Sequence, residues 1–252
     1  MDKKIFVVND LNGDEDKIAK VVNFIESSDF SDGDILVENG GALVRDLWNS
    51  DFEGPIGQRK EEQKEKFFDN LERLNEAVRG KGGSMILVND FYLEKRLGGE
   101  SRQIIGDPGF CREINGFLKK NGIQECSWSR RIGRVLIIGA QGIDYGLGKS
   151  VMEELKDIEI VVAPYVPVFD GDWFPFKVYM NEIEKKRIEK LKKIIERLPG
   201  RRKICIGGHL RPDRETSGLR EIAYDSLLSK EEDKAATCVW NPPGKVIKIE
   251  CL

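Results

Sequence analysis

The sequence contains a single histidine, His209, and this scarcity limits the metal chemistry that one chain could support. Imidazole is the commonest metal ligand that proteins use, and sites for transition metals often need several of them. A site built on several imidazole ligands is therefore excluded unless a second chain contributes to it.

Cysteine is also scarce, and its spacing is typical of neither a zinc ribbon nor a disulfide framework. The chain has five cysteines, an odd number, and no Cys-x-x-Cys pair. They are Cys111, Cys126, Cys205, Cys238 and Cys251. This pattern favours reduced thiols and a cytoplasmic location.

Two further features are missing: a long apolar run and a strong charge of one sign. The run at 5–8 is too short for a signal peptide, and no run approaches the roughly 20 residues of a membrane-spanning helix. Lys and Arg number 41 and Asp and Glu 44, so the net charge of −3 gives no general attraction to nucleic acid. The short basic clusters at 130–134 and 201–203 are expected to be solvated surface. We therefore expect neither a membrane nor a nucleic-acid partner.

What the sequence does contain is an alternation of short apolar runs with charged segments of helical periodicity. The predicted strands are 5–8, 35–37, 85–88, 135–138, 158–163, 203–206, 237–240 and 245–249. The predicted helices are 15–25, 61–78, 114–121, 150–155 and 177–198. Strands separated by helices indicate an α/β fold. The simplest organisation is one domain over residues 1–252, with loops at 49–59 and 97–109 on the rim of a site.

One glycine-rich segment, 139–150, follows a predicted strand and ends in Gly-Lys-Ser, as phosphate-binding loops do. Its spacing does not fit such a loop. Position 143 is Ile where the first glycine should stand, and Gly142 is one residue too distant. We therefore expect an ordinary glycine-rich turn in a connection between secondary-structure elements.

Five other segments, at 6–14, 35–41, 86–91, 161–167 and 208–212, each place polar, glycine or proline residues after an apolar run. In this order they resemble the five motifs of the calcineurin-like metallophosphoesterases, and the resemblance covers nearly the whole chain. It implies an α/β fold of four layers, an α/β/β/α sandwich with two mixed sheets. The motif loops of such a fold gather at one edge of the sandwich.

The resemblance also assigns candidate site residues. Asp10, Asn89 and His209 agree in kind with metal ligands of the family. Asn12 and Asp90 stand where the family has histidines, and each could donate an oxygen instead. The resemblance implies a catalytic or phosphate-contacting role for His209.

Two substitutions argue against a dinuclear metal centre. Gly41 replaces the aspartate that would bridge two ions, and glycine offers no ligand. Arg211 replaces a histidine and puts a permanent positive charge where an ion would lie. Arg211 should point toward Asp10 and pair with it, unless it turns to solvent. We therefore predict a degenerate phosphoesterase fold without a cofactor, which binds a phosphate-bearing small molecule. Its ligand-binding residues would be Asp10, Asn12, Asn89, Asp90 and Arg211.

The alternative is a residual phosphoesterase that hydrolyses phosphomonoesters or phosphodiesters with one Mg²⁺ or Mn²⁺ ion. Its metal ligands would be Asp10, Asn89 and His209, with Asp90 and water as further oxygen donors. The sequence leaves open whether the chain is an enzyme. A purely structural role also stays open for Asp10, which could cap the helix that begins near Asp14.

The segment Tyr165–Phe176 is unusually rich in aromatic residues and proline for a loop. It has two interpretations of equal weight: an interface for a protein partner, or a lid packed over the site. The solvent exposure of Trp173 and Phe174 would distinguish them.

Overall fold

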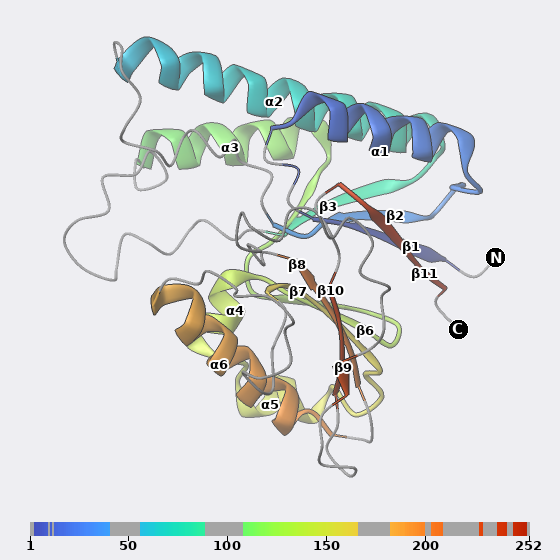
Figure 1. Ribbon diagram of the computed structural model, residues 1–252, viewed down its shortest axis with the longest axis vertical. Coiled ribbons are helices and arrows are strands. Elements are labelled where there is room, and N and C mark those ends of the chain that lie inside the picture. The colour runs from blue at the N-terminus through green and yellow to red at the C-terminus, as the bar shows by residue number, and fades with distance from the viewer. Residues whose placement is uncertain are drawn as a thin grey trace, which may run out of the picture.

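The computed structural model describes residues 3–9, 11, 13–40, 56–88, 108–165, 182–199, 203–208, 227–228, 236–240 and 244–250. Two β-sheets lie face to face in this part of the chain, and helices cover the outer face of each (Figure 1).

The first sheet has the strand order β11-β1-β2-β3-β4. Its members are β1 (Lys4–Val8), β2 (Ile35–Glu38), β3 (Ser84–Val88), β4 (Gln124–Cys126) and β11 (Val246–Glu250). Strands β1 to β4 run parallel to one another, whereas β11 pairs antiparallel with β1 and closes one edge. This sheet, called sheet A below, is therefore mixed.

The second sheet, sheet B, has the order β5-β6-β7-β8-β10-β9. Its members are β5 (Ser129–Ile132), β6 (Val135–Ile138), β7 (Ile160–Tyr165), β8 (Lys203–Gly208), β9 (Leu227–Leu228) and β10 (Ala236–Trp240). The four central strands are parallel, and the two outer strands pair antiparallel with their neighbours.

Alternation of side chains along the strands builds three apolar layers. In β1, Ile5 and Val7 belong to the core between the two sheets, whereas Phe6 and Val8 belong to the core beneath the helices of sheet A. A third core lies between sheet B and its own helices and includes Leu136. The predicted four-layer α/β/β/α sandwich with two mixed sheets is confirmed.

The helices divide between the two outer layers (Figure 1). Sheet A is covered by α1 (Glu15–Ser27), α2 (Ile56–Gly80) and α3 (Pro108–Asn121). Sheet B is covered by α4 (Ala140–Tyr145), α5 (Lys149–Glu153) and α6 (Glu182–Arg197). No helix in the described ranges is long and apolar enough to cross a membrane.

Helix α1 is capped by Asp14, the residue that directly precedes it. The Asp14 carboxylate accepts hydrogen bonds from the backbone N–H groups of Asp16, at 3.1 Å, and Lys17, at 3.2 Å. A capping side chain must reach the first-turn N–H groups of its helix, and Asp14 does so here. The idea that Asp10 caps this helix is therefore wrong.

Several predicted boundaries also need correction. Helix α2 begins at Ile56 and α3 at Pro108, so the expected loops at 49–59 and 97–109 each extend into a helix. Strands β4 and β5 were not expected, because their sequences QEC and SRRI contain few apolar residues. Both depend on pairing with an apolar neighbour, β4 with β3 and β5 with β6.

The expectation of solvated basic clusters is partly wrong. Arg134 lies at the surface and pairs with Glu159 at 2.8 Å. Lys203, in contrast, is only 5% exposed, and its Nζ donates to the Pro199 carbonyl at 2.7 Å. Burial lowers the pKa of this lysine.

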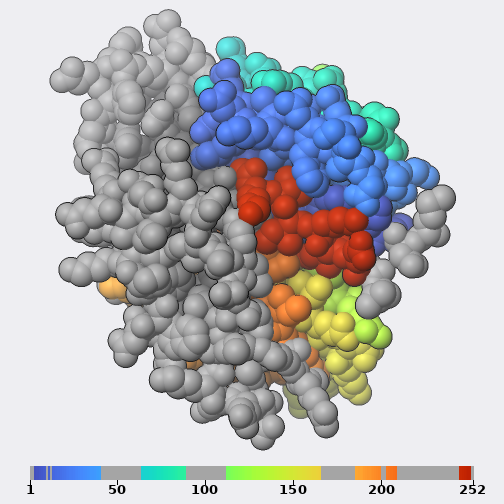
Figure 2. Space-filling model, turned by 45° about the vertical axis from the view of Figure 1, so that its right-hand side comes forward, coloured from blue at the N-terminus to red at the C-terminus, as the bar shows by residue number. Residues whose placement is uncertain are grey.

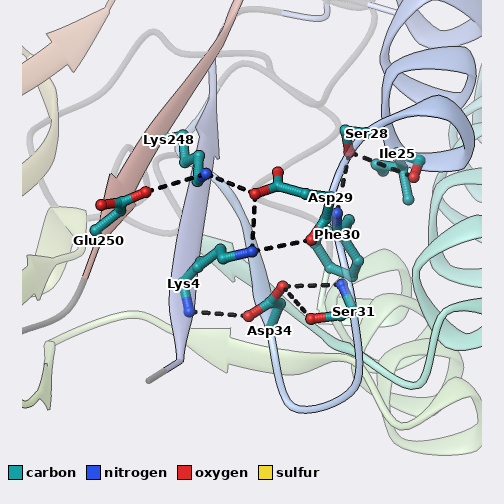
Figure 3. A network of polar contacts seen from close by, with 9 residues as sticks. All are labelled: Lys4, Ile25, Ser28, Asp29, Phe30, Ser31, Asp34, Lys248 and Glu250. Carbon is teal, nitrogen blue, oxygen red and sulfur yellow. Dashed lines mark hydrogen bonds and ion pairs between the residues drawn. The ribbon is translucent and has the colours of Figure 1, made fainter. Parts of the chain in front are cut away.

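The amino end of β1 is held by charged contacts that connect distant parts of the chain (Figure 3). The Asp29 carboxylate accepts from Lys248 Nζ at 2.6 Å and from Lys4 Nζ at 2.8 Å. Hydrogen bonds from these two lysines lower the pKa of Asp29 to about 2. The C-terminal strand β11, red in Figure 2, is thereby fastened to the N-terminal part of the chain.

Candidate functional site

The carboxyl ends of the parallel strands in both sheets lie at one edge of the sandwich, where two side chains connect the sheets. Ligand sites in α/β folds favour the carboxyl ends of strands, because the loops that follow converge there. The described residues of this edge include Asn9, Glu38, Asn39, Ala163 and Gly208.

Asn9 connects the end of β1 to the end of β8. Its side chain is fully buried. In the amide orientation that satisfies its neighbours, Oδ1 accepts from the Gly208 N–H at 2.6 Å and Nδ2 donates to the Val8 carbonyl at 3.1 Å. The Asn9 carbonyl also accepts from the Gly244 N–H at 2.9 Å. Asn9 therefore joins sheet A, sheet B and the turn before β11.

Gly208 has to be a glycine for this connection to form. A Cβ atom at this position would lie 2.8 Å from the Asn9 Cβ and closer still to the end of its amide group. Real Cβ atoms do not approach other heavy atoms so closely, so a side chain would push the two strand ends apart.

Asn39 makes the second connection, from β2 to β7. It is 1% exposed, and its Nδ2 donates to the Ala163 carbonyl at 2.7 Å across 124 positions of sequence. Its backbone N–H donates to the Val8 carbonyl at 2.8 Å. Strands β1, β2, β7 and β8 carry the first, second, fourth and fifth motif segments. Their carboxyl ends are thus in contact, directly or through the side chain of Asn9 or Asn39.

The predicted site residues themselves lie outside the described residues. This applies to Asp10, Asn12, Gly41, Asn89, Asp90, His209 and Arg211. In the sequence, Asp10 follows Asn9 directly and His209 follows Gly208 directly. The roles assigned to these residues stay predictions, and what is established is the contact between the strand ends that precede them.

Sequence reasoning gave no role to the polar residues of this edge. Asn9, Glu38 and Asn39 are all buried, which is unusual for their residue types. Glu38 pairs in register with Val8, on the helix-covered face of sheet A, whereas Asn9 and Asn39 reach toward sheet B. The available signal was a polar residue directly after a run of buried apolar ones.

No group of three His, Cys, Asp or Glu side chains gathers anywhere in the described part of the chain. Cys126 and Cys205 are buried, and burial raises the pKa of the Cys126 thiol to about 12. Neither of these thiols is therefore suited to be a reactive nucleophile.

A buried ion pair anchors the carboxyl end of β7, where the aromatic segment begins. Arg187 is 4% exposed; its Nη2 lies 3.1 Å from the Asp144 carboxylate and its Nη1 donates to the Tyr165 hydroxyl at 2.7 Å. Burial alone would lower the pKa of Arg187, but its interactions with Tyr165 and Asp144 outweigh this and raise it. Tyr165 is buried, whereas Trp173 and Phe174 lie outside the described residues, so both interpretations of 165–176 stay predictions.

The glycine-rich segment 139–150 forms a structural connection, as its spacing suggested. Gly139 precedes helix α4 and donates to the Trp128 carbonyl at 2.8 Å. A Cβ at Gly139 or Gly142 would collide with backbone atoms of 126–128. These glycines therefore allow α4 to pack against the connection between β4 and β5, and Lys149 lies in the separate helix α5.

Comparisons with known proteins support the fold and go no further. The sequence matches no protein-family model and no curated protein. One crystal structure aligns over 100% of both chains at 14% identity with a TM-score of 0.54, which shows a shared fold. The protein TT1561 of Thermus thermophilus aligns over 100% of both chains at 11% identity, with a TM-score of 0.46. The cold-active protein-tyrosine phosphatase of a Shewanella species aligns over 99% of this chain and 76% of that chain, at 13% identity and a TM-score of 0.40.

Proposed function

We propose that this chain is a degenerate calcineurin-like phosphoesterase that has lost the dinuclear metal centre and binds a phosphate-bearing small molecule. The observation that carries this proposal is the pair of contacts Asn9–Gly208 and Asn39–Ala163. They hold together the strand ends from which four of the five motif segments continue. The four-layer fold is the one that the motif resemblance requires.

The residues that replace metal ligands explain how an anion would be held. Arg211 supplies a guanidinium whose paired N–H donors match two phosphate oxygens, with no ion between them. In the absence of ligand, Asp10 is the partner that the motif alignment offers to this cation. The bridging carboxylate is missing at Gly41, and Glu38, on the helix-covered face of β2, does not lie on the face of Asn9 and Asn39.

Residual hydrolysis with one Mg²⁺ or Mn²⁺ ion is the competing function. It would use Asp10, Asn89 and His209 as ligands, with Asp90 as an added oxygen donor. A protein-binding role for 165–176 is a third candidate, and it is compatible with either chemistry. The buried contact of Tyr165 with Arg187 gives this segment a fixed starting point.

The test is calorimetric titration with inorganic phosphate, in the presence of a chelator. We expect saturable binding by the native chain. Arg211→Ala should weaken it by about 1.5–3 kcal/mol, as expected for a lost hydrogen bond to a charged group. Arg79→Ala is the matched control, because Arg79 is exposed in the last turn of α2.

Binding that is unchanged in Arg211→Ala would overturn the assignment of that residue. Binding that needs an added divalent ion, together with turnover of a phosphodiester, would instead support the single-ion enzyme.

A further inference from the structure

A groove with a cationic rim lies on the outer face of sheet B, between α4 and α5 on one side and α6 on the other. Its volume is about 420 Å³, within the range of pockets that hold small molecules. It is formed in a different layer from the strand-end edge, by the helices that cover sheet B (Figure 1).

Four cationic side chains line this groove, against one carboxylate. Lys149 comes from α5, and α6 contributes Lys190, Lys193 and Arg197. The three from α6 are separated by three and four positions, which places them along one face of the helix. The carboxylate belongs to Asp144, which is already paired with buried Arg187 at 3.1 Å.

Most of this positive charge is not offset by the described residues. Lys149, Lys193 and Arg197 are exposed, and none of them makes an ion pair or a side-chain hydrogen bond within the part of the chain described here. Like charges gathered around one concave surface repel one another and raise the local concentration of anions. The rim therefore suits a ligand with more than one negative charge.

The rest of the lining favours a planar ring beside that charge. Ile143 and Ile194 are buried residues of the groove wall. At its mouth, Tyr145 is 53% exposed and stacks on Trp128, which is 51% exposed, with ring centroids 5.7 Å apart. An exposed aromatic pair beside cationic side chains is the combination that stacks bases and holds phosphates in nucleotide-binding surfaces.

We propose that this groove is a binding site for a nucleoside diphosphate. The phosphates contact Lys149, Lys193 and Arg197, and the base packs against Tyr145 and the apolar wall. Asp144 is fixed by Arg187 and holds Lys190 through a 3.4 Å ion pair, which orients one side of the rim. The proposal does not depend on the function of the strand-end site.

The experiment is a calorimetric titration of the full chain with ADP and, separately, with pyrophosphate. The double variant Lys193→Gln and Arg197→Gln should weaken ADP binding by at least about tenfold, since two charge-assisted contacts are lost. The matched control is Lys119→Gln with Lys120→Gln, which removes the same charge from exposed positions of α3. Its ADP affinity should equal that of the native chain.

Tyr145→Ala tests the ring contact. It should weaken ADP binding and leave pyrophosphate binding in the groove unchanged. Thermal melting of each variant shows whether it is folded before it is titrated.

Three results would overturn the proposal: no saturable ADP binding at millimolar concentration, equal ADP affinity in the Lys193/Arg197 double variant, or binding of a single-stranded oligonucleotide but not of ADP. Loss of ADP binding in Arg211→Ala, with the groove variants unaffected, would place the nucleotide at the strand-end edge instead. If phosphate binding at that edge fails while ADP binding persists, only the proposed function is contradicted.

Discussion

The two sheets contribute different kinds of groups to the edge where they meet. Sheet A contributes side chains, the amides of Asn9 and Asn39. Sheet B contributes backbone groups, the N–H of Gly208 and the carbonyl of Ala163, and has only small residues at those positions. The contact between the sheets therefore depends on polar side chains in sheet A and on small residues in sheet B.

The outer layers differ as well. The core beneath the helices of sheet A includes phenylalanine pairs such as Phe6 with Phe30, whose ring centroids are 4.9 Å apart. The corresponding core of sheet B is mainly aliphatic, and its helices leave a cationic groove at the surface. The helices that cover sheet B therefore also present Lys149, Lys193 and Arg197, which form no ion pair with a described residue.

The largest expected effects come from truncating one residue in each outer core. Phe67→Ala and Leu191→Ala remove fully buried side chains from the helices of sheet A and sheet B, and should cost about 3–5 and 2–5 kcal/mol. Because the inter-sheet core joins the halves, both variants should lower the midpoint of a single urea transition followed by tryptophan fluorescence.

Val151→Ala is the control for this pair, because Val151 is 38% exposed and its truncation should change stability by less than about 0.5 kcal/mol. Two separate transitions in the Leu191 variant would mean that the sheets unfold independently, against the expectation of one domain.

Gly208→Ala tests the contribution of sheet B to the edge where the sheets meet. The added methyl group collides with the Asn9 side chain, so unfolding free energy should fall by about 1–3 kcal/mol, the usual cost of overpacking. Gly148→Ala adds the same group in open space and should have little effect in the same denaturation assay. Equal stability of the two variants would show that Asn9 does not pack against Gly208.

Asn39→Ala tests the contribution of sheet A to the same edge. It removes the donor to the Ala163 carbonyl and leaves that buried oxygen without this bond, at a cost of about 1–2 kcal/mol. Asn39→Gln should also be less stable than the native chain. Its side chain is one methylene longer, so its amide cannot take the position from which Asn39 donates to the Ala163 carbonyl at 2.7 Å. A stability loss below the error of chemical denaturation would contradict the role of this hydrogen bond.

The smallest effect concerns Asp29, at the amino end of β1. Its pKa is lowered from 3.8 to about 2 in the folded chain, so its ion pairs stabilise the fold above about pH 4. That contribution is lost as the pH falls toward 2, when the folded carboxylate takes up its proton. The stability difference between native chain and Asp29→Asn should therefore shrink between pH 4 and pH 2, and also in high salt.

Asp32→Asn is the matched control, since Asp32 lies in the same connection and forms no ion pair with a described residue. If the stability difference between the native chain and Asp29→Asn does not change with pH, Lys4 and Lys248 do not act on the Asp29 carboxylate.

The strands and helices that carry strong patterns were predictable, and the rest were not. Apolar runs indicated β1, β2, β3, β6, β7, β8, β10 and β11, and helical patterns indicated α1, α2, α3, α5 and α6. In β5, however, no apolar run exists, because an edge strand that faces solvent needs little apolar surface. Helix α4 was missed because its six residues include a glycine that only tertiary packing requires.

The candidate site shows the same limit. The motif order predicted which strand ends would gather, and the contacts of Asn9 and Asn39 confirm that four of them do. Those contacts could not be predicted, because an asparagine does not specify a backbone partner 124 positions away. The roles of Asp10 and His209 rest on resemblance alone, and stay predictions.

The most direct test of a degenerate site is the metal content of protein purified without chelators, measured beside hydrolysis of bis(p-nitrophenyl) phosphate on the same sample. We predict far less than two bound divalent ions per chain, the stoichiometry of a two-metal site, and no hydrolysis that a chelator can abolish. Two equivalents of ion per chain, with hydrolysis that is lost on chelation and restored by Mn²⁺, would contradict it.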